Sequence, residues 1–131
     1  MAEINFTAGQ IFVLSPYFSA LEGTPLKFSL KRKLIRFNER LSAEYKLIRE
    51  ELDKVVKEYC KKDEEGNPII ENNKYVFDDE KVEEVNKKMF EIENSVINFE
   101  YEDFKLPEEA FDNLSCTKEI VKIIEDNFLE V

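Results

Sequence analysis

The sequence predicts a mainly helical α+β protein built around a long antiparallel helical hairpin. Two apolar stripes at helical spacing flank residues 61–77, KKDEEGNPIIENNKYVF, a segment typical of a β-hairpin. We therefore expect a long helix, a small β element capping one end, and a returning helix, braced by short N- and C-terminal helices. The length of 131 residues and a hydrophobic content of 43% predict one domain over residues 1–131.

A short strand and a helix start are expected first. Residues 3–6 alternate, which places Ile4 and Phe6 on one side of a strand. Thr7 and Gln10 have the spacing of a capping box, in which each side chain accepts a hydrogen bond from the other residue's backbone N–H. A helix should therefore begin directly after Thr7.

The first helix is expected to be amphipathic. Its apolar positions are Ile11, Leu14, Phe18 and Leu21. Pro16 should kink or split it, because proline lacks the N–H that the helix interior needs. We expect Gly23 to end it in the left-handed conformation, and Thr24 and Pro25 to open the next helix as cap and first residue.

Nine apolar residues at spacings of three or four predict the long helix. They are Leu30, Leu34, Phe37, Leu41, Tyr45, Ile48, Leu52, Val55 and Tyr59. The absence of Pro and Gly from residue 26 to 65 predicts a helix of about 37 residues that Gly66-Asn67-Pro68 ends. Two successive spacings of four around Leu41 favour an intramolecular bundle over an extended coiled coil.

The returning half of the hairpin begins after a tight turn. Asn72-Asn73 tolerates the positive φ angles of a hairpin tip, and the acidic run 78–80 suits a helix N-terminus. The stripe of the next helix, expected to pack antiparallel on the long one, is Val82, Val85, Met89, Ile92 and Val96.

The last third should hold a strand and two short helices. Residues 96–106 alternate, with Ile97, Phe99, Tyr101 and Phe104 on the buried side. Pro107 and Ser115 are expected to begin the two helices. The apolar face of the final helix is Ile120, Val121, Ile124 and Phe128.

Composition excludes several classes of chemistry. Without histidine, Ser–His and Cys–His nucleophilic schemes and most zinc sites are excluded, and no glycine-rich phosphate loop is present. The Asp63 segment resembles a calcium loop but breaks its ligand alternation at Pro68. We expect no enzyme activity, no catalytic residues, no cofactor and no metal. Cys60 and Cys116 are expected to be buried thiols rather than a disulfide.

Targeting signals and overall charge limit the location and the partners. No signal peptide and no run of about 18 apolar residues is present, so we expect an intracellular protein without a membrane partner. Residues 1–62 carry a net charge of +4 and residues 63–131 carry −14. This acidic surplus disfavours duplex nucleic acid as a partner.

Two charged surfaces are candidate binding sites. The favoured one is acidic: Glu100, Glu102, Asp103, Glu108 and Glu109. The alternative is a basic ridge on the long helix: Lys31, Arg32, Lys33, Arg36 and Arg40. Arginines at i, i+4 and i+8 share one side of a helix and suit phosphate geometry. The ridge has three interpretations: a solvated face, which we favour, a site for an anionic ligand, and an internal dock for the acidic C-terminal segments.

The order of elements, with the segments KDEEGNPII, KYVF and ExxVIN, resembles a family of small proteins of unknown function encoded by temperate phages of Gram-positive bacteria. The resemblance extends from about residue 4 to residue 128 and is strongest over residues 63–77. It implies a phage or prophage origin, the cytoplasm of a bacterial host cell and an accessory role. It assigns no functional residues.

Three functions are therefore expected, in order. The first is a non-enzymatic phage accessory protein that binds a host macromolecule, such as a component of a bacterial defence system, and modulates it by inhibition. The second is a sponge that sequesters a small anionic nucleotide on the arginine ridge. The third is a phage assembly or structural component. The sequence leaves the oligomeric state open.

Overall fold

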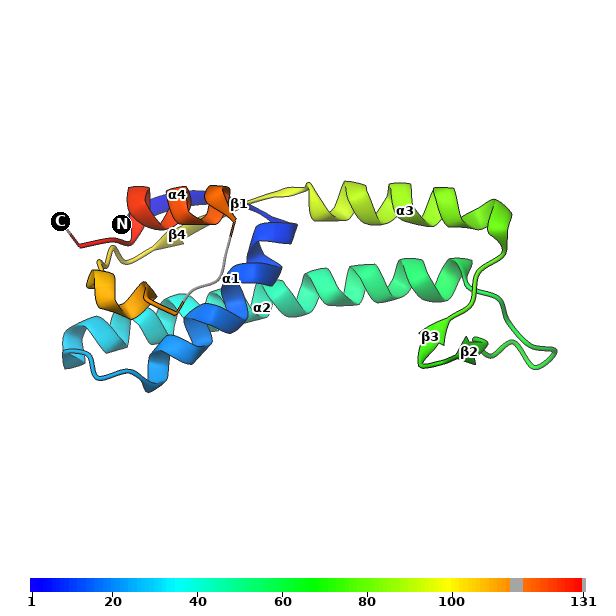
Figure 1. The fold of residues 1–131 in the computed structure, drawn as a ribbon, viewed down its shortest axis with the longest axis horizontal. Helices are drawn as coiled ribbons and strands as arrows, with labels where there is room; N and C mark the ends of the chain where they lie inside the picture. The colour runs from blue at the N-terminus through cyan, green and yellow to red at the C-terminus, as the bar shows by residue number, and fades with distance from the viewer. Residues whose placement is uncertain (114–116, 131) are drawn as a thin grey trace. The chain divides into compact units, whose positions relative to one another are not determined.

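The computed structural model describes residues 1–113 and 117–130, and it confirms a mainly helical α+β fold (Figure 1). The chain forms two compact units. The core unit comprises residues 1–45 and the chain from residue 96 onward, and the hairpin unit comprises residues 46–95. The elements are β1 (Ala2–Thr7), α1 (Ala8–Ala20), η1 (Leu21–Gly23), α2 (Phe28–Tyr59), β2 (Ile70–Glu71), β3 (Lys74–Tyr75), α3 (Asp79–Glu93), β4 (Val96–Tyr101), η2 (Glu108–Phe111) and α4 (Lys118–Asn127).

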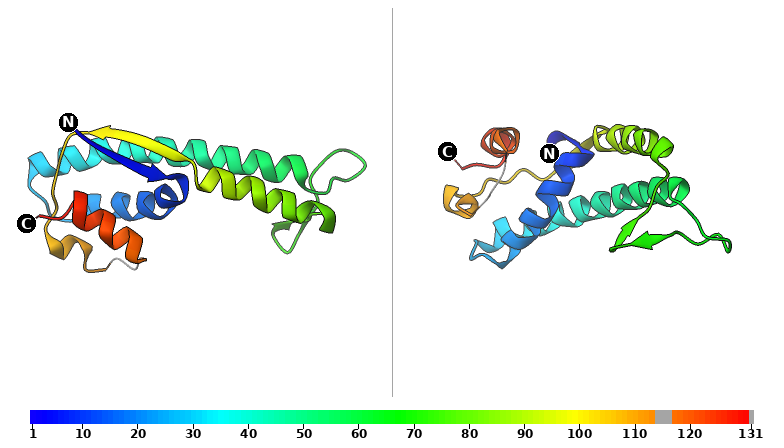
Figure 2. Two further views of the ribbon diagram at one scale, coloured as in Figure 1. Left: turned by 90° about the horizontal axis from the view of Figure 1, so that it is seen from above. Right: turned by 45° about the vertical axis from the view of Figure 1, so that its right-hand side comes forward.

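The core unit contains a two-stranded antiparallel sheet of β1 and β4, which lie side by side (Figure 2). Ile4 is paired with Phe99, and both side chains are buried on the inner face, as the alternation predicts. Phe6 packs edge-to-face on Phe99 with ring centroids 5.4 Å apart. The pairing of the N-terminal strand with β4 was not predicted, because alternation identifies a strand but not its partner.

The capping box at the start of α1 is confirmed. The Thr7 hydroxyl accepts a hydrogen bond from the Gln10 N–H at 3.2 Å, and the Gln10 side chain accepts one from the Thr7 N–H at 2.9 Å. The predicted apolar positions Ile11 and Phe18 are fully buried. Pro16 lies inside α1 without splitting it into two helices.

The predicted junction between the first two helices is wrong. Gly23 lies in η1 and does not have a positive φ angle, so it is not a left-handed cap. Thr24 donates both its N–H and its hydroxyl to the carbonyl of Leu21, at 3.0 and 2.7 Å. Because the hydroxyl closes the preceding turn, it does not cap α2, which begins at Phe28 rather than at Pro25.

Helix α2 is shorter than predicted and ends at Tyr59, well before Gly66. The backbone of Lys61 is used by the following β segment: its N–H donates to Val76 at 2.7 Å, and its carbonyl accepts from Ile69 at 2.9 Å. These bonds replace the helical ones, so long-range pairing ends the helix where no local stop signal exists. The nine-residue apolar stripe itself is buried or half-buried throughout.

The segment between α2 and α3 is a tight hairpin, as predicted. Asn72 and Asn73 have φ angles of 52° and 63°, which two-residue hairpin turns with both central residues left-handed require. The preceding turn is ordered by Asp63, whose carboxylate accepts the N–H groups of Glu65 and Asn67 at 2.9 and 3.0 Å. Gly66 supplies the φ of 84° that this turn needs.

The core unit is built around Phe37. Its ring lies between 5.1 and 6.1 Å, centroid to centroid, from five other aromatic rings: Phe18, Phe99, Tyr101, Phe104 and Phe128. These rings come from α1, β4, the segment after β4 and the end of α4. The aromatic cluster therefore joins every layer of the core unit.

The final helix agrees only partly with its predicted apolar face. Ile120, Ile124 and Phe128 are buried, but Val121 is exposed and its assignment to the core is wrong. One face of α4 packs on the core unit, and Val121 follows Ile120 directly, so it turns away from that face. The predicted start at Ser115 and the predicted buried thiol of Cys116 lie outside the described residues.

The hairpin unit is much more thinly packed than the core unit. The last part of α2 and α3 run antiparallel, as predicted (Figure 1). Of the described residues in this unit, only three hydrophobic ones are buried, namely Ile48, Cys60 and Val85. The burial of the Cys60 thiol was predicted. Five large apolar side chains there are exposed: Leu47, Ile70, Tyr75, Val82 and Phe90.

Two residues of the predicted returning stripe are not buried. Val82 is exposed because a pair of helices covers each stripe from one side only. Val96 is exposed because it begins β4 instead of continuing α3, which ends at Glu93. The stripe of α3 is therefore reduced to Val85, with Met89 and Ile92 half-buried.

This packing contrast predicts different costs for two leucines of α2. Leu41→Ala should reduce the free energy of unfolding by about 2–5 kcal/mol, because Leu41 is fully buried in the core unit. Leu52→Ala should cost less than about 2 kcal/mol, because Leu52 is only half-buried in the hairpin unit. Urea unfolding followed by circular dichroism measures both. Equal losses would contradict the packing contrast.

Candidate functional site

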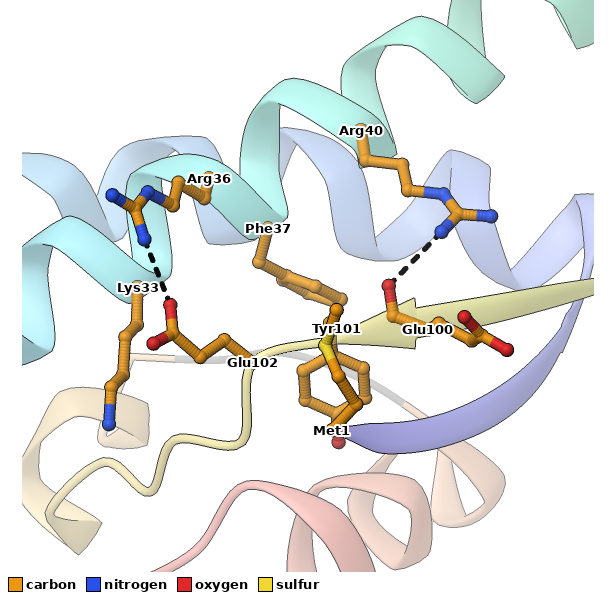
Figure 3. A pocket seen from close by; sticks show the side chains of 8 residues that line it. All are labelled: Met1, Lys33, Arg36, Phe37, Arg40, Glu100, Tyr101 and Glu102. Atoms are coloured by element: carbon orange, nitrogen blue, oxygen red, sulfur yellow. Dashed lines mark hydrogen bonds and ion pairs between the residues drawn. The ribbon is translucent and has the colours of Figure 1, made fainter.

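A groove in the core unit brings both predicted charged surfaces together. We call it the charged groove; its volume is about 470 Å³ (Figure 3). It is lined by Met1, Lys33, Arg36, Phe37, Arg40, Glu100, Tyr101 and Glu102. Three residues of the basic ridge on α2 thus face two of the predicted acidic residues.

Arg36 is paired with Glu102 across the groove. Its guanidinium donates to the Glu102 carboxylate at 3.0 Å (Figure 3). Both side chains remain about half exposed, at 57% and 50%. Exposed pairs of this kind contribute only about 0.2–1 kcal/mol, because water screens the charges. The pair therefore positions the two side chains without contributing much to stability.

Arg40 has a structural role at the other end of the groove. It donates to the backbone carbonyls of Glu100 at 3.0 Å and Asn98 at 3.1 Å, and its guanidinium lies 4.8 Å from the centroid of the Phe99 ring. These contacts satisfy carbonyls on the edge of β4 that does not face β1. Arg40 is consequently not free to bind a ligand.

Lys33 is the uncommitted cation of the charged groove. Its ammonium group has no hydrogen bond or ion pair with any residue that the structure describes. Figure 3 shows it at the same end of the groove as Arg36 and Glu102, whereas the Glu100 carboxylate lies at the end near Arg40. A smaller adjoining cavity of about 80 Å³ is lined by Ser29, Arg32, Lys33, Arg36 and Glu102, which adds Arg32 to the cationic end.

Two exposed residues of the basic ridge also contact other parts of the core unit. Arg36 and Arg40 contact β4 and the residue that follows it, which supports the internal dock among the three interpretations. Lys31 lines neither of the two cavities at this end. The sequence does not reveal these contacts, because they depend on a strand about sixty residues later in the chain.

The five predicted acidic residues lie in different cavities, pairs and elements. Glu100 and Glu102 line the charged groove, and Asp103 pairs with Lys105 at 3.4 Å. Glu108 and Glu109 lie in η2. Glu108 lines a separate cavity of about 330 Å³ with Phe111, Asp112, Val121, Ile124, Glu125 and Leu129.

A second groove, which sequence reasoning missed, lies in the hairpin unit. We call it the apolar groove; its volume is about 430 Å³. It is lined by Val56, Asn73, Lys74, Tyr75, Phe77, Val82, Val85, Asn86 and Met89. It involves α2, the β2–β3 hairpin and α3. One sequence feature could have predicted this groove: the two-stranded hairpin contains apolar residues and has no third strand to cover them.

Polar pairs order the end of the hairpin unit beside this groove. The Tyr59 hydroxyl donates to the Glu84 carboxylate at 3.2 Å, and this hydrogen bond is the main cause that raises the pKa of Tyr59. Lys61 pairs with Asp78, the residue before α3, at 3.4 Å. Both pairs connect the end of α2 to the start of α3.

Neither a cluster of metal-ligand side chains nor a membrane-spanning helix is present among the described residues. Nowhere in residues 1–113 and 117–130 do three His, Cys, Asp or Glu side chains gather as metal ligands would. The Asp63 carboxylate, the first residue of the calcium-like segment, is used to order its own turn. None of the described helices has the length and apolar character needed to cross a bilayer.

Comparisons with protein-family models, curated proteins and solved structures find no match to this chain. The function must therefore be argued from the two grooves.

The two arginines of the charged groove should differ in their effect on stability. Arg40→Met should lower the free energy of unfolding by about 1–2 kcal/mol, because it leaves two strand carbonyls without their charged donor. Arg36→Met should cost less than about 1 kcal/mol, because its pair is half exposed. Thermal and urea unfolding of both variants measure the difference. A larger loss for Arg36→Met would show that the roles are reversed.

Ionisation of Tyr101 should lower the free energy of unfolding at alkaline pH. Burial, and secondly the nearby Asp103 carboxylate, raise the pKa of Tyr101 above its ordinary value of about 10. The folded state therefore favours the neutral phenol, and its contribution is complete below about pH 10 and lost as the pH rises through the higher folded pKa. Tyr101→Phe should reduce the stability loss between about pH 9 and pH 11 in urea unfolding. If Tyr101→Phe loses as much stability as the parent over this pH range, the loss is caused by other groups.

Proposed function

We propose that the protein is a non-enzymatic binding protein whose hairpin unit docks on a protein partner through the apolar groove. One observation carries this: the hairpin unit exposes apolar side chains that a self-sufficient domain would bury. Among the described residues, this unit holds three of the twenty buried hydrophobic residues and five of the ten exposed large ones. An apolar surface rimmed by polar residues is typical of an interaction site.

The architecture explains why this unit cannot bury its own apolar surface. A pair of helices covers each stripe from one side, and a two-stranded hairpin alone is marginally stable in water. Tyr75 is 37% exposed and Val82 is 41% exposed, although both are large apolar residues that line the apolar groove. A partner that buries them would gain the hydrophobic free energy that the hairpin unit leaves unused.

Charge indicates the chemistry of the partner. The exposed acidic residues of α3 are Asp79, Glu80, Glu83, Glu84, Glu91 and Glu93. They outnumber the three lysines of that helix, so the apolar groove lies beside a predominantly negative helix. The complementary surface carries an apolar anchor surrounded by Lys and Arg, and such complementarity accelerates and orients association.

The biological setting of this proposal rests on the sequence resemblance. The segment of strongest resemblance, residues 63–77, is the one that builds the β2–β3 hairpin and contributes Tyr75 and Phe77 to the apolar groove. We therefore propose a phage accessory protein that acts in the cytoplasm of a bacterial host. Its partner would be a host protein, such as a defence-system component, inhibited by occupation of its basic surface.

Two valines provide a matched test. Val82 on α3 lines the apolar groove and is 41% exposed, and Val121 on α4 lies in the other unit and is 42% exposed. Val82→Glu should weaken partner binding by about tenfold or more, because it places a charge in the apolar groove. Val121→Glu should bind like the parent. Partners are identified by co-purification from infected cells, and the affinity is then measured with purified proteins.

Stability and oligomeric state serve as controls for this test. Both variants should melt within a few degrees of the parent, because neither valine is buried. Retained binding by Val82→Glu would exclude the apolar groove as the interface. If the partner is a second copy of the chain and Val82→Glu dissolves that oligomer, the assembly role replaces the proposed one.

A further inference from the structure

We propose that the charged groove binds a small organic phosphate, namely a phosphate monoester that carries an apolar or aromatic group. This goes beyond the proposed protein-binding function, because it uses the core unit and none of the residues of the apolar groove. The argument rests on three features of the groove: an uncommitted cation, an internal carboxylate that occupies the place of an anion, and an aromatic wall.

The cationic end of the groove is suited to an oxyanion. Lys33 and Arg36 are three residues apart on α2 and so project from the same side of the helix. Both line the charged groove, and Arg32 joins them in the adjoining cavity. Among the described residues that line the adjoining cavity, Glu102 supplies one carboxylate against these three cations. The local charge is therefore positive in an otherwise acidic protein.

Glu102 shows where the anion of a ligand would lie. Its carboxylate oxygen accepts from the Arg36 guanidinium at 3.0 Å, the geometry that a phosphate oxygen would adopt. Because the pair is half exposed, it is weak and exchangeable. A phosphate dianion carries twice the charge of a carboxylate and would meet Arg36 with Lys33 at the same end of the groove, so it should displace Glu102.

The rest of the groove determines which phosphate fits. Its middle is lined by Phe37 and Tyr101, whose rings belong to the aromatic cluster (Figure 3). A volume of about 470 Å³ lies within the range of small-molecule sites. At the far end Arg40 is committed to strand carbonyls, and the Glu100 carboxylate would repel a second phosphate. These features favour one phosphate with an apolar group over a polyphosphate.

Phenyl phosphate is the probe that tests this site, with binding measured by calorimetric titration and by NMR shift perturbation. Lys33→Ala should weaken binding about tenfold, because it removes a charged hydrogen-bond donor. Lys31→Ala is the matched control, since both lysines are partly exposed on α2 but Lys31 does not line the groove. Lys31→Ala should leave the affinity unchanged.

Glu102→Gln provides the readout that a purely structural role would not give. It removes the negative charge that competes for Arg36 and leaves only a weaker amide acceptor, so the affinity for phenyl phosphate should increase roughly twofold to fivefold. Circular dichroism should show an unchanged fold, because the residue is half exposed. Inorganic phosphate should bind more weakly than phenyl phosphate, since it gains nothing from the aromatic wall. A nucleoside monophosphate that binds more tightly than phenyl phosphate would identify nucleotides as the source of the ligand.

Three results would overturn the proposal. The first is no binding of phenyl phosphate at millimolar concentration to either the parent or Glu102→Gln. The second is an equal loss for Lys33→Ala and Lys31→Ala, which would show general attraction to a basic helix. The third is inorganic phosphate binding as tightly as phenyl phosphate, which would remove the organic group from the assignment.

Discussion

The core unit depends on the burial of one side chain, Phe37, among the aromatic rings of α1, β4 and the C-terminal segments. Five rings lie within 6.1 Å of it, centroid to centroid. Edge-to-face and tilted contacts of this kind each add about 0.5–1.5 kcal/mol to the free energy of burial. Phe37 therefore fixes the position and the rotation of α2 against β4. The charged groove is a consequence of that rotation, because Arg36 precedes Phe37 and Arg40 follows it by three residues. With Phe37 buried under the sheet, both guanidinium groups are held at the edge of β4, one on a carboxylate and one on backbone carbonyls.

Features whose physical cause is local could be predicted from the sequence. The Thr7–Gln10 capping box, the alternation of β1 and β4, and the left-handed pair Asn72-Asn73 each depend on interactions within a few residues, and the structure confirms all of them. Features that depend on a distant partner could not be predicted. Helix α2 ends at Tyr59 because Lys61 pairs with Val76, and no residue near Lys61 signals this. Thr24 is a residue type that often caps the start of a helix. Its hydroxyl instead donates to Leu21 and closes the preceding turn.

The same dependence on distant partners explains why the sequence predicted the candidate sites only in part. The sequence shows how many Lys, Arg, Asp and Glu are present. It cannot show that the Arg40 guanidinium is hydrogen-bonded to β4, whereas the Lys33 ammonium group has no partner among the described residues. The sequence therefore suggested two opposed surfaces, an acidic face and a basic ridge, where the structure has one groove that contains members of both. The apolar groove was missed for a related reason. A helical stripe predicts which residues face a partner helix, and it does not predict how completely a single partner covers them.

Helix α2 is used in two different ways along its length. Up to Tyr45 its stripe is buried or half-buried in the core unit, and from Lys46 onward it belongs to the hairpin unit together with α3 and the β2–β3 hairpin. The two successive spacings of four around Leu41 occur just before this change. Such a stutter shifts the stripe around the helix, which allows one helix to meet different partners on either side of it. This division separates the requirements of the two proposed activities. The charged groove needs the rigid aromatic cluster to place its cations, whereas the apolar groove needs a unit with few buried side chains of its own, because only exposed apolar surface can be buried by a partner.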